Sequence, residues 1–209
     1  MLVAHLAARG KIEPRVETID LGEGAWVNFE ADFVPDHLAL MARLTATLPL
    51  RQEPIVLFGR TVATPRLTSW HGDPGCSYAY SGRVFVPRPW SPELAVLRDR
   101  LTLREGCPFN SVLVNHYRDG HDAMGEHADD EPELGPSVDD VRIASVSLGA
   151  ERRFVLRHRR TRKVHAFHLG EGSVLVMGGT TQRYFRHHVP RTRTFVGPRM
   201  NLTFRVIHV

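Results

Sequence analysis

The chain has 209 residues, of which 42% are hydrophobic and 24% are charged, as in a single globular domain. This composition excludes a largely disordered chain, and the absence of an apolar run of ~20 residues excludes a transmembrane protein. The net charge of +4 permits a polyanionic partner without requiring one. Cys76 and Cys107 lie far apart without a C-x-x-C, which argues against a disulfide scaffold and a cysteine-built zinc site. Residues 1–15 lack the features of a secretory signal. We therefore expect a monomer inside the cell, cytoplasmic in a bacterium or nuclear in a eukaryote, with no membrane partner.

Two amphipathic segments before residue 108 predict helices. The first follows Pro35-Asp36, and its apolar residues recur at roughly helical spacing: Leu38, Leu40, Met41, Leu44 and Leu48. The second has clearer boundaries, because Ser91 can cap a helix, Pro92 suits the first helical position and Gly106 ends the pattern. Its apolar residues, one turn apart, are Leu94, Leu97 and Leu101.

After residue 108 the hydrophobic period changes from helical spacing to two, which predicts strands. The predicted strands cover residues 111–117, 141–148, 153–157, 163–169, 173–177 and 201–209. Glycine-containing turns separate several of them. Many short strands in this half favour an antiparallel sandwich or a jelly roll. Residues 1–32 show no clear period.

One local pattern, Gly125-Glu126-His127-Ala128-Asp129, suggests a metal site. His127 and Asp129 are two residues apart, so on an extended segment both face the same side. A later histidine, His187 or His188, would complete a triad of two histidines and one carboxylate, which leaves three positions open on a non-haem Fe(II). The spacing alone is weak, since the same pattern suits a surface turn with a solvated carboxylate.

The last predicted strand carries two arginines on an otherwise core-like segment. Alternation places one set of side chains on one face, namely Arg199, Asn201, Thr203 and Arg205, and the apolar set Met200, Leu202 and Phe204 on the other. Buried guanidinium groups are costly unless they meet anions. A dicarboxylate ligand would satisfy them, although protein carboxylates would do so equally well.

In order along the chain, these motifs resemble the AlkB family of Fe(II)/2-oxoglutarate-dependent dioxygenases. The matching pieces are Asn115-His116-Tyr117, residues 125–131 (GEHADDE), residues 143–149 (IASVSLG), His187, and residues 199–205 (RMNLTFR). The R-x-N-x-x-x-R ending is more specific than the H-x-D. Further segments resemble the subgroup that repairs duplex DNA in animals, namely residues 57–60, 64–66, 78–82, 87–90 and 154–159.

The resemblance implies a mainly β (α+β) fold, a double-stranded β-helix or jelly roll, in one domain over residues 1–209. Residues 1–30 would be an N-terminal extension, residues 31–108 would hold the helices and a nucleotide-recognition lid, and residues 109–209 would form the catalytic core. The implied reaction removes alkyl groups from N-alkylated bases in DNA, of the 1-methyladenine and 3-methylcytosine type. It would consume 2-oxoglutarate and O2 and release succinate, CO2 and an aldehyde.

Carried over residue by residue, the resemblance also implies the site. The Fe(II) ligands would be His127, Asp129 and His187, and the 2-oxoglutarate contacts would be Arg199, Arg205, Asn115, Tyr117 and Asn201. Arg205 is expected to hold the distal carboxylate of 2-oxoglutarate. Arg199 is expected to organise the region near the iron and the substrate.

The expected nucleic-acid contacts follow from the same resemblance. A base must leave the DNA duplex to reach the iron. Tyr78 and Tyr80 would stack on the flipped base, Glu131 would contact an exocyclic nitrogen, and Phe58 would fill the gap. Arg66 is expected to be a further substrate contact. The alternative is that Phe58 and the tyrosines pack in the core.

Basic side chains concentrate between residues 152 and 163, where seven arginines and lysines occur. Residues 157–163 read as the tip of a hairpin, in which Arg157 and Arg159 would bind phosphates, unless the hairpin is merely solvated. Two further functions stay open. The chain could demethylate RNA or hydroxylate a protein or small molecule on the same scaffold, or it could be a non-catalytic binding module with structural histidines.

Overall fold

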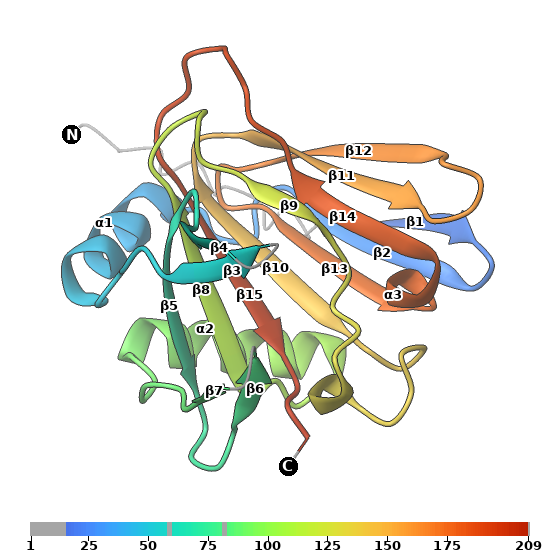
Figure 1. Ribbon diagram of the computed structural model, residues 1–209, viewed down its shortest axis with the longest axis horizontal. Coiled ribbons are helices and arrows are strands. Elements are labelled where there is room, and N and C mark those ends of the chain that lie inside the picture. Colours follow the sequence, from blue (N-terminus) through green and yellow to red (C-terminus); the bar gives the residue numbers. More distant parts are fainter. Residues whose placement is uncertain (1–15, 58–59, 81–82, 209) are drawn as a thin grey trace, which may run out of the picture.

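A computed structural model describes residues 16–57, 60–80 and 83–208. In this part of the chain, two antiparallel sheets form a jelly roll, and two short hairpins and two longer helices are added to it (Figure 1). The prediction of a mainly β jelly roll with N-terminal helices is confirmed. No helix among the described residues is long and apolar enough to cross a membrane.

The larger sheet has seven strands in the order β1-β2-β13-β10-β15-β8-β5. They are β1 (Glu17–Gly22), β2 (Ala25–Glu30), β5 (Leu67–Gly72), β8 (Ser111–Tyr117), β10 (Ile143–Gly149), β13 (Val174–Gly179) and β15 (Arg199–Arg205). The smaller sheet has the order β12-β11-β14-β9. Its strands are β9 (Met124–His127), β11 (Arg152–His158), β12 (Val164–Leu169) and β14 (Phe185–Val189).

The remaining elements connect and cover the sheets. The two hairpins are β3 (Pro54–Leu57) with β4 (Arg60–Ala63), and β6 (Tyr78–Tyr80) with β7 (Arg83–Phe85). The helices are α1 (His37–Thr47), α2 (Pro92–Glu105), α3 (Thr181–Tyr184) and the 3-10 turn η1 (Pro132–Leu134).

The two longer helices form where the sequence predicts them. In α2, the Ser91 hydroxyl accepts a hydrogen bond from the Leu94 amide at 3.3 Å, and Gly106 ends the helix in the left-handed region at φ 59°. In α1, Leu40, Met41 and Leu44 are buried as expected. Leu38 is 66% exposed and is not part of the apolar face, which corrects that part of the prediction.

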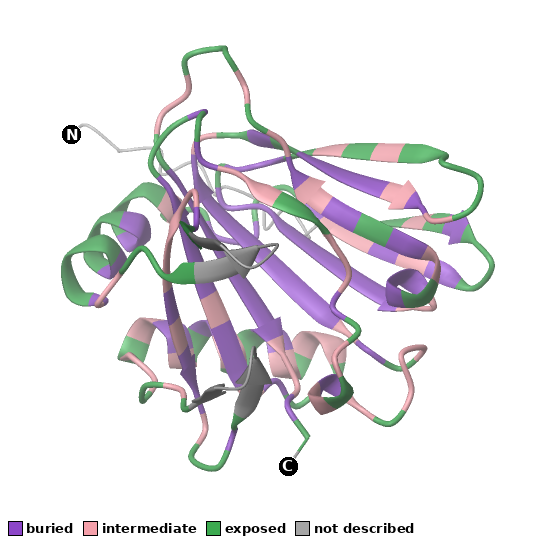
Figure 2. Ribbon diagram, viewed as in Figure 1, coloured by how far each residue is buried: buried purple, intermediate pink, exposed green. Residues whose placement is uncertain are grey.

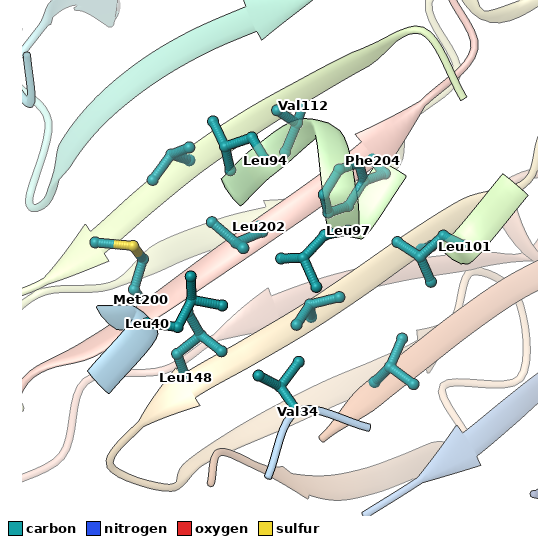
Figure 3. Close-up of a cluster of buried hydrophobic side chains, with 14 of the residues drawn as sticks. Val34, Leu40, Leu94, Leu97, Leu101, Val112, Leu148, Met200, Leu202 and Phe204 are labelled. Atoms are coloured by element: carbon teal, nitrogen blue, oxygen red, sulfur yellow. The ribbon is translucent and has the colours of Figure 1, made fainter. Parts of the chain in front are cut away.

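Both helices pack on the outer face of the larger sheet. Figure 3 shows leucines of α1 and α2 in contact with side chains from β8, β10 and β15. On β15 these are Met200, Leu202 and Phe204, all with zero exposure. The burial of each large aliphatic side chain stabilises this layer by about 1.5–3 kcal/mol.

A second core lies between the two sheets. Its members on the smaller sheet include Phe154, Leu156 and Phe185, and its members on the larger sheet include Leu175 and Met177. The strands β10 and β13 of the larger sheet are almost entirely buried, whereas in the smaller sheet β11 is mostly buried and β12 and β9 are largely exposed or intermediate (Figure 2). On β15, however, the inward-facing side chains are polar or charged, namely Arg199, Asn201, Thr203 and Arg205, so the inner face changes from apolar on β13 to polar on β15.

The structure differs from the sequence predictions at three boundaries. Residues 1–30 were expected to be an extension, but within them β1 pairs with β2, and β2 pairs with β13 of the larger sheet. The catalytic core was expected to start at residue 109, but β5 pairs with β8 from residue 67 onward. The last strand ends at Arg205 rather than 209, because the Asn110 amide group bonds both the N–H and the C=O of Ile207 at 2.7 Å.

Candidate active site

His127, Asp129 and His187 come together between the two sheets. His127 ends β9, and His187 lies directly opposite it on β14. Asp129 lies two residues beyond the end of β9, outside the strand. One ligand atom from each of the three lies within 4.8 Å of the others. His187 rather than His188 joins this cluster, in agreement with the sequence-based choice.

The side chains of the triad are aimed at a common centre. The Nδ1 atom of His127 is 2.9 Å from the Gly125 carbonyl oxygen, which leaves Nε2 to face Asp129 at 3.9 Å. The Nε2 atom of His187 is 3.7 Å from Oδ2 of Asp129. That carboxylate oxygen is buried and has no hydrogen-bond partner among the described residues. A divalent cation between the three groups would satisfy it, so these residues fit an Fe(II) ion.

Burial and neighbouring charges shift the pKa values of His187 and Asp129. Burial lowers the pKa of His187 to about 3, so the imidazole is neutral and can act as a ligand near pH 7. For Asp129, burial alone would raise the pKa, but Arg205, His187 and His127 outweigh it and hold the pKa below the usual value. A neutral imidazole and an ionised carboxylate are the forms that bind metal ions.

Arg205 lies beside the metal triad. Its Nη2 atom donates to Oδ1 of Asp129 at 2.7 Å, and its side chain is 19% exposed. This contact leaves Oδ2 of the same carboxylate directed at His187. Arg205 therefore orients a metal ligand.

Arg199 lies at the other end of β15 and is almost completely buried, at 1% exposure. Its guanidinium donates to the Ser147 hydroxyl at 2.7 Å and to the Leu169 carbonyl at 3.1 Å, and it lies 5.3 Å from the Tyr117 ring centre. Burial lowers its pKa to about 10, which still leaves it protonated near pH 7. No carboxylate of the described chain pairs with it, and its Nη1 atom is buried without a hydrogen-bond partner there.

The contacts of the two arginines favour a different division of roles from the one that the sequence suggests. Arg205 was expected to hold the distal carboxylate of 2-oxoglutarate, with Arg199 near the iron. Instead Arg205 contacts the metal ligand Asp129, while Arg199 is the buried cation that lacks an anion. The sequence could not distinguish them, because alternation places both on one face of β15 and does not say which end meets the metal.

The other expected 2-oxoglutarate contacts line the same cavity as the two histidines of the triad and the two arginines. Tyr117, Asn115 and Asn201 all face it. Asn201 donates to the Ser145 hydroxyl at 2.7 Å and accepts from Thr203 at 2.8 Å. These side chains come from β8 and β15, which pair residue by residue from Asn115–Asn201 to Tyr117–Arg199.

Sequence reasoning missed several residues of the site. Ser145 and Ser147 face inward from β10 and bond Asn201 and Arg199. Their alternation with Ala144 and Val146 in a buried strand was a signal that could have found them. Gln182 contacts the backbone of Asp129 from α3, and no local pattern indicates that contact.

The expected nucleic-acid contacts are only partly described. Phe58 lies outside the described residues, and so do the side chains of Tyr78 and Tyr80, whose backbone forms β6. Arg66 donates to the Asn115 side chain at 2.8 Å, beside the cavity. Glu131 immediately precedes η1, two residues after Asp129.

The basic hairpin forms as predicted, with β11 and β12 joined by residues 159–163. Its two expected phosphate-binding residues contact protein groups. Arg157 lies 3.7 Å from the Glu126 carboxylate, while Arg159 donates to Asp130 at 2.7 Å and to the Gln182 carbonyl at 3.0 Å.

Comparisons with known proteins agree with this geometry. The family model of the 2OG-Fe(II) oxygenase superfamily matches residues 34–205. The chain is 43% identical over 161 residues to mouse "DNA oxidative demethylase ALKBH2", a match that covers 73% of this chain and 66% of that protein. It is 32% identical over 223 residues to the Arabidopsis thaliana protein of the same name, with 93% and 70% covered.

Among solved structures, "The structure of OsALKBH1" superposes with a TM-score of 0.60 at 20% identity, covering 86% of this chain and 97% of that one. This likeness concerns the fold. The match to the mouse protein spans about two thirds of its length. The sequence matches and the His-Asp-His cluster together show that the chain belongs to the 2OG-Fe(II) oxygenase superfamily and, within it, to the AlkB family, whose members act with Fe(II), 2-oxoglutarate and O2.

Proposed function

We propose that the protein removes alkyl groups from N-alkylated bases in DNA. For a methylated base, 2-oxoglutarate and O2 would be converted to succinate, CO2 and a hydroxymethylated base, which then loses formaldehyde. The observation that carries the proposal is the space between the two sheets, where the His127-Asp129-His187 cluster faces the inner side of β15 with its buried, unpaired Arg199. The likeness to the mouse DNA oxidative demethylase supports DNA as the substrate.

Three chain residues would hold the metal. His127, Asp129 and His187 would hold Fe(II), and three protein ligands would leave the ion accessible to 2-oxoglutarate and O2. Bound there, the ion supplies the oxidative chemistry. Asp129 and His187 are buried, whereas the side chain of His127 is 33% exposed. The alkylated base therefore approaches from the His127 side.

Arg199 holds the distal carboxylate of 2-oxoglutarate. Its free Nη1 atom points to an acceptor that the described chain does not supply, and a guanidinium–carboxylate pair is strongest in a buried site. Tyr117 and Asn115 face the same cavity and orient the cosubstrate. Arg205 keeps Asp129 ionised and directed at the metal.

The flipped base would be held from outside this cavity. Tyr78 and Tyr80 stack on it, Glu131 contacts its exocyclic nitrogen, and Phe58 fills the space that it leaves in the duplex. Arg66 supports the pocket through Asn115. Arg157 exchanges Glu126 for a phosphate, since 3.7 Å is a weak ion pair at the surface. We also expect the enzyme to act inside the cell as a monomer.

A product assay tests this function. Duplex and single-stranded oligonucleotides carrying 1-methyladenine or 3-methylcytosine are incubated with Fe(II), ascorbate and 2-oxoglutarate, and the DNA is analysed by mass spectrometry. We expect a loss of 14 Da per methylated base, and no loss with Asp129→Ala. Matched RNA oligonucleotides serve as competitors. Succinate formation without any change in DNA mass, or faster demethylation of RNA, would contradict the proposal.

The Phe58 contact is tested in the same assay. Phe58→Ala should slow repair in duplex DNA more than repair in single strands, because only the duplex leaves a gap to fill. An equal loss of repair rate on duplex and single-stranded DNA, with a lower melting temperature of the protein, would instead indicate that Phe58 packs in the core.

A further inference from the structure

The metal ligand Asp129 lies in a segment that belongs to no strand. Strand β9 ends at His127, and the next element, η1, begins at Pro132. A sheet ladder therefore does not fix the position of Asp129. Its backbone N–H donates instead to the side-chain carbonyl oxygen of Gln182, at 3.0 Å.

Gln182 is suited to hold that segment in place. It has zero exposure, so its hydrogen bond to Asp129 is shielded from water. Its amide nitrogen lies 3.7 Å from the sulfur of Met177, which fixes the orientation of the side chain. A buried acceptor that is directed at one backbone N–H constrains the residue that carries it.

Arg159 joins the same group of contacts from the hairpin turn. Its Nη2 atom donates both to the backbone carbonyl oxygen of Gln182 at 3.0 Å and to the Asp130 carboxylate at 2.7 Å. Arg159 therefore binds α3 and the residue after Asp129 simultaneously. These two contacts favour a positioning role for Arg159 over the phosphate contact that the sequence suggests.

Helix α3 links this segment to the rest of the iron site. It ends at Tyr184, and β14, which carries His187, begins at the next residue. At its start, the Thr181 hydroxyl bonds the carbonyl oxygens of Gly178 at 2.5 Å and Trp26 at 3.1 Å, which attaches α3 to the larger sheet. The Asp129 segment is thus bonded to the turn that leads directly to His187.

We infer that Gln182, assisted by Arg159, is a positioning residue that sets Asp129 relative to His187 before the metal binds. Arg205 donates a hydrogen bond to one carboxylate oxygen of Asp129 at 2.7 Å. The hydrogen bond from the Asp129 backbone to Gln182 fixes the position of that residue, so that the other carboxylate oxygen stays directed at His187. This inference goes beyond the proposed function, and it holds whatever substrate the enzyme oxidises.

Metal titration of the apoprotein tests the inference without any DNA or turnover. Co(II) affinity and melting temperature are measured for Gln182→Met, which keeps the size but loses the acceptor, and for Gln182→Glu, which keeps an acceptor oxygen. Loss of a residue that orients a ligand typically costs 10–100-fold in metal affinity. We expect about a 10-fold loss for Gln182→Met and recovery of most of it in Gln182→Glu.

Arg183→Gln is the control on the same helix. It removes an exposed ion pair with Asp139 and touches neither Gln182 nor Asp129, so it should leave Co(II) affinity unchanged. If Gln182→Met binds Co(II) as tightly as Arg183→Gln does, the inference is overturned.

A surface pair decides the question if Gln182→Met fails to fold. Arg159→Gln removes the contacts with Asp130 and with the backbone carbonyl oxygen of Gln182. Arg160→Gln removes only an exposed ion pair with Glu23 at 3.1 Å. Weaker Co(II) binding by Arg159→Gln alone supports the inference. Equal affinities in both variants contradict it.

Discussion

The two faces of β15 are built from alternate residues of one strand, yet one is apolar and the other is polar and charged. The outer face packs Met200, Leu202 and Phe204 against two helices, and its stability comes from apolar burial. The inner face carries Arg199 and Arg205, whose charges are costly to bury without partners. One face therefore stabilises the fold, and the other holds groups whose partners are a metal ligand and, in our proposal, a substrate. Variants on the two faces should separate stability from function.

The largest effect is expected on the inner side. His187→Ala removes one metal ligand, and succinate formation should fall below detection while the fold persists. His188→Ala is the adjacent control, because His188 is not part of the triad, and it should retain bound iron. Metal content and succinate are measured for both proteins. Iron loss in His188→Ala, with iron retained in His187→Ala, would show that the wrong histidine was assigned.

The outer face should show the opposite pattern. Leu202→Ala leaves a cavity in a fully buried layer and should lower the free energy of unfolding by about 2–5 kcal/mol. Chemical denaturation measures this loss, and 2-oxoglutarate affinity of the folded protein should not change. Val96→Ala, at a residue of α2 that is 66% exposed, should cost close to nothing. A large loss of 2-oxoglutarate affinity in folded Leu202→Ala would mean that the two faces are coupled.

A smaller effect is expected at the edge of the outer layer. Ser91→Ala removes the acceptor for the Leu94 amide at the start of α2 and should cost about 1 kcal/mol of stability. Ser91→Asp keeps an acceptor and should restore most of it. Equal destabilisation by both substitutions would show that the cap is not the cause.

The smallest effect concerns pH. Burial lowers the pKa of Arg199 to about 10, so its charge is complete near pH 7 and is lost only as pH rises through 10. The contribution of Arg199 to binding should therefore be constant between about pH 7 and pH 8.5. The ratio of affinities for 2-oxoglutarate and 2-oxopentanoate, which lacks the distal carboxylate, isolates that contribution. A steep fall of this ratio below pH 8.5 would indicate that a group other than Arg199 binds the distal carboxylate.

The predictability of the two faces differs for physical reasons. Hydrophobic spacing indicated α2 and the apolar face of β15, because burial of apolar side chains decides both. The hairpin of β1 and β2 was missed, although Gly22-Glu23-Gly24 between two alternating segments is typical of a turn. Its strands become clear only once β13 provides a partner.

The candidate site was predictable in composition but not in contacts. Motif resemblance identified the three residues of the triad and both arginines. The contact between Arg205 and Asp129 joins residues 76 positions apart, and that between Gln182 and Asp129 joins residues 53 apart. A local sequence pattern does not record contacts over such separations, so the contacts of the two arginines required the structure.

One binding measurement tests the central claim that Arg199 meets the distal carboxylate. Affinities for 2-oxoglutarate and 2-oxopentanoate are measured on metal-loaded wild type, Arg199→Ala and Arg205→Ala. A buried charge-assisted pair is worth about 2–5 kcal/mol, so the wild type should prefer 2-oxoglutarate by at least ~30-fold. We predict that Arg199→Ala loses this preference and that Arg205→Ala keeps it while binding metal more weakly. A preference that survives in Arg199→Ala and disappears in Arg205→Ala would contradict the account.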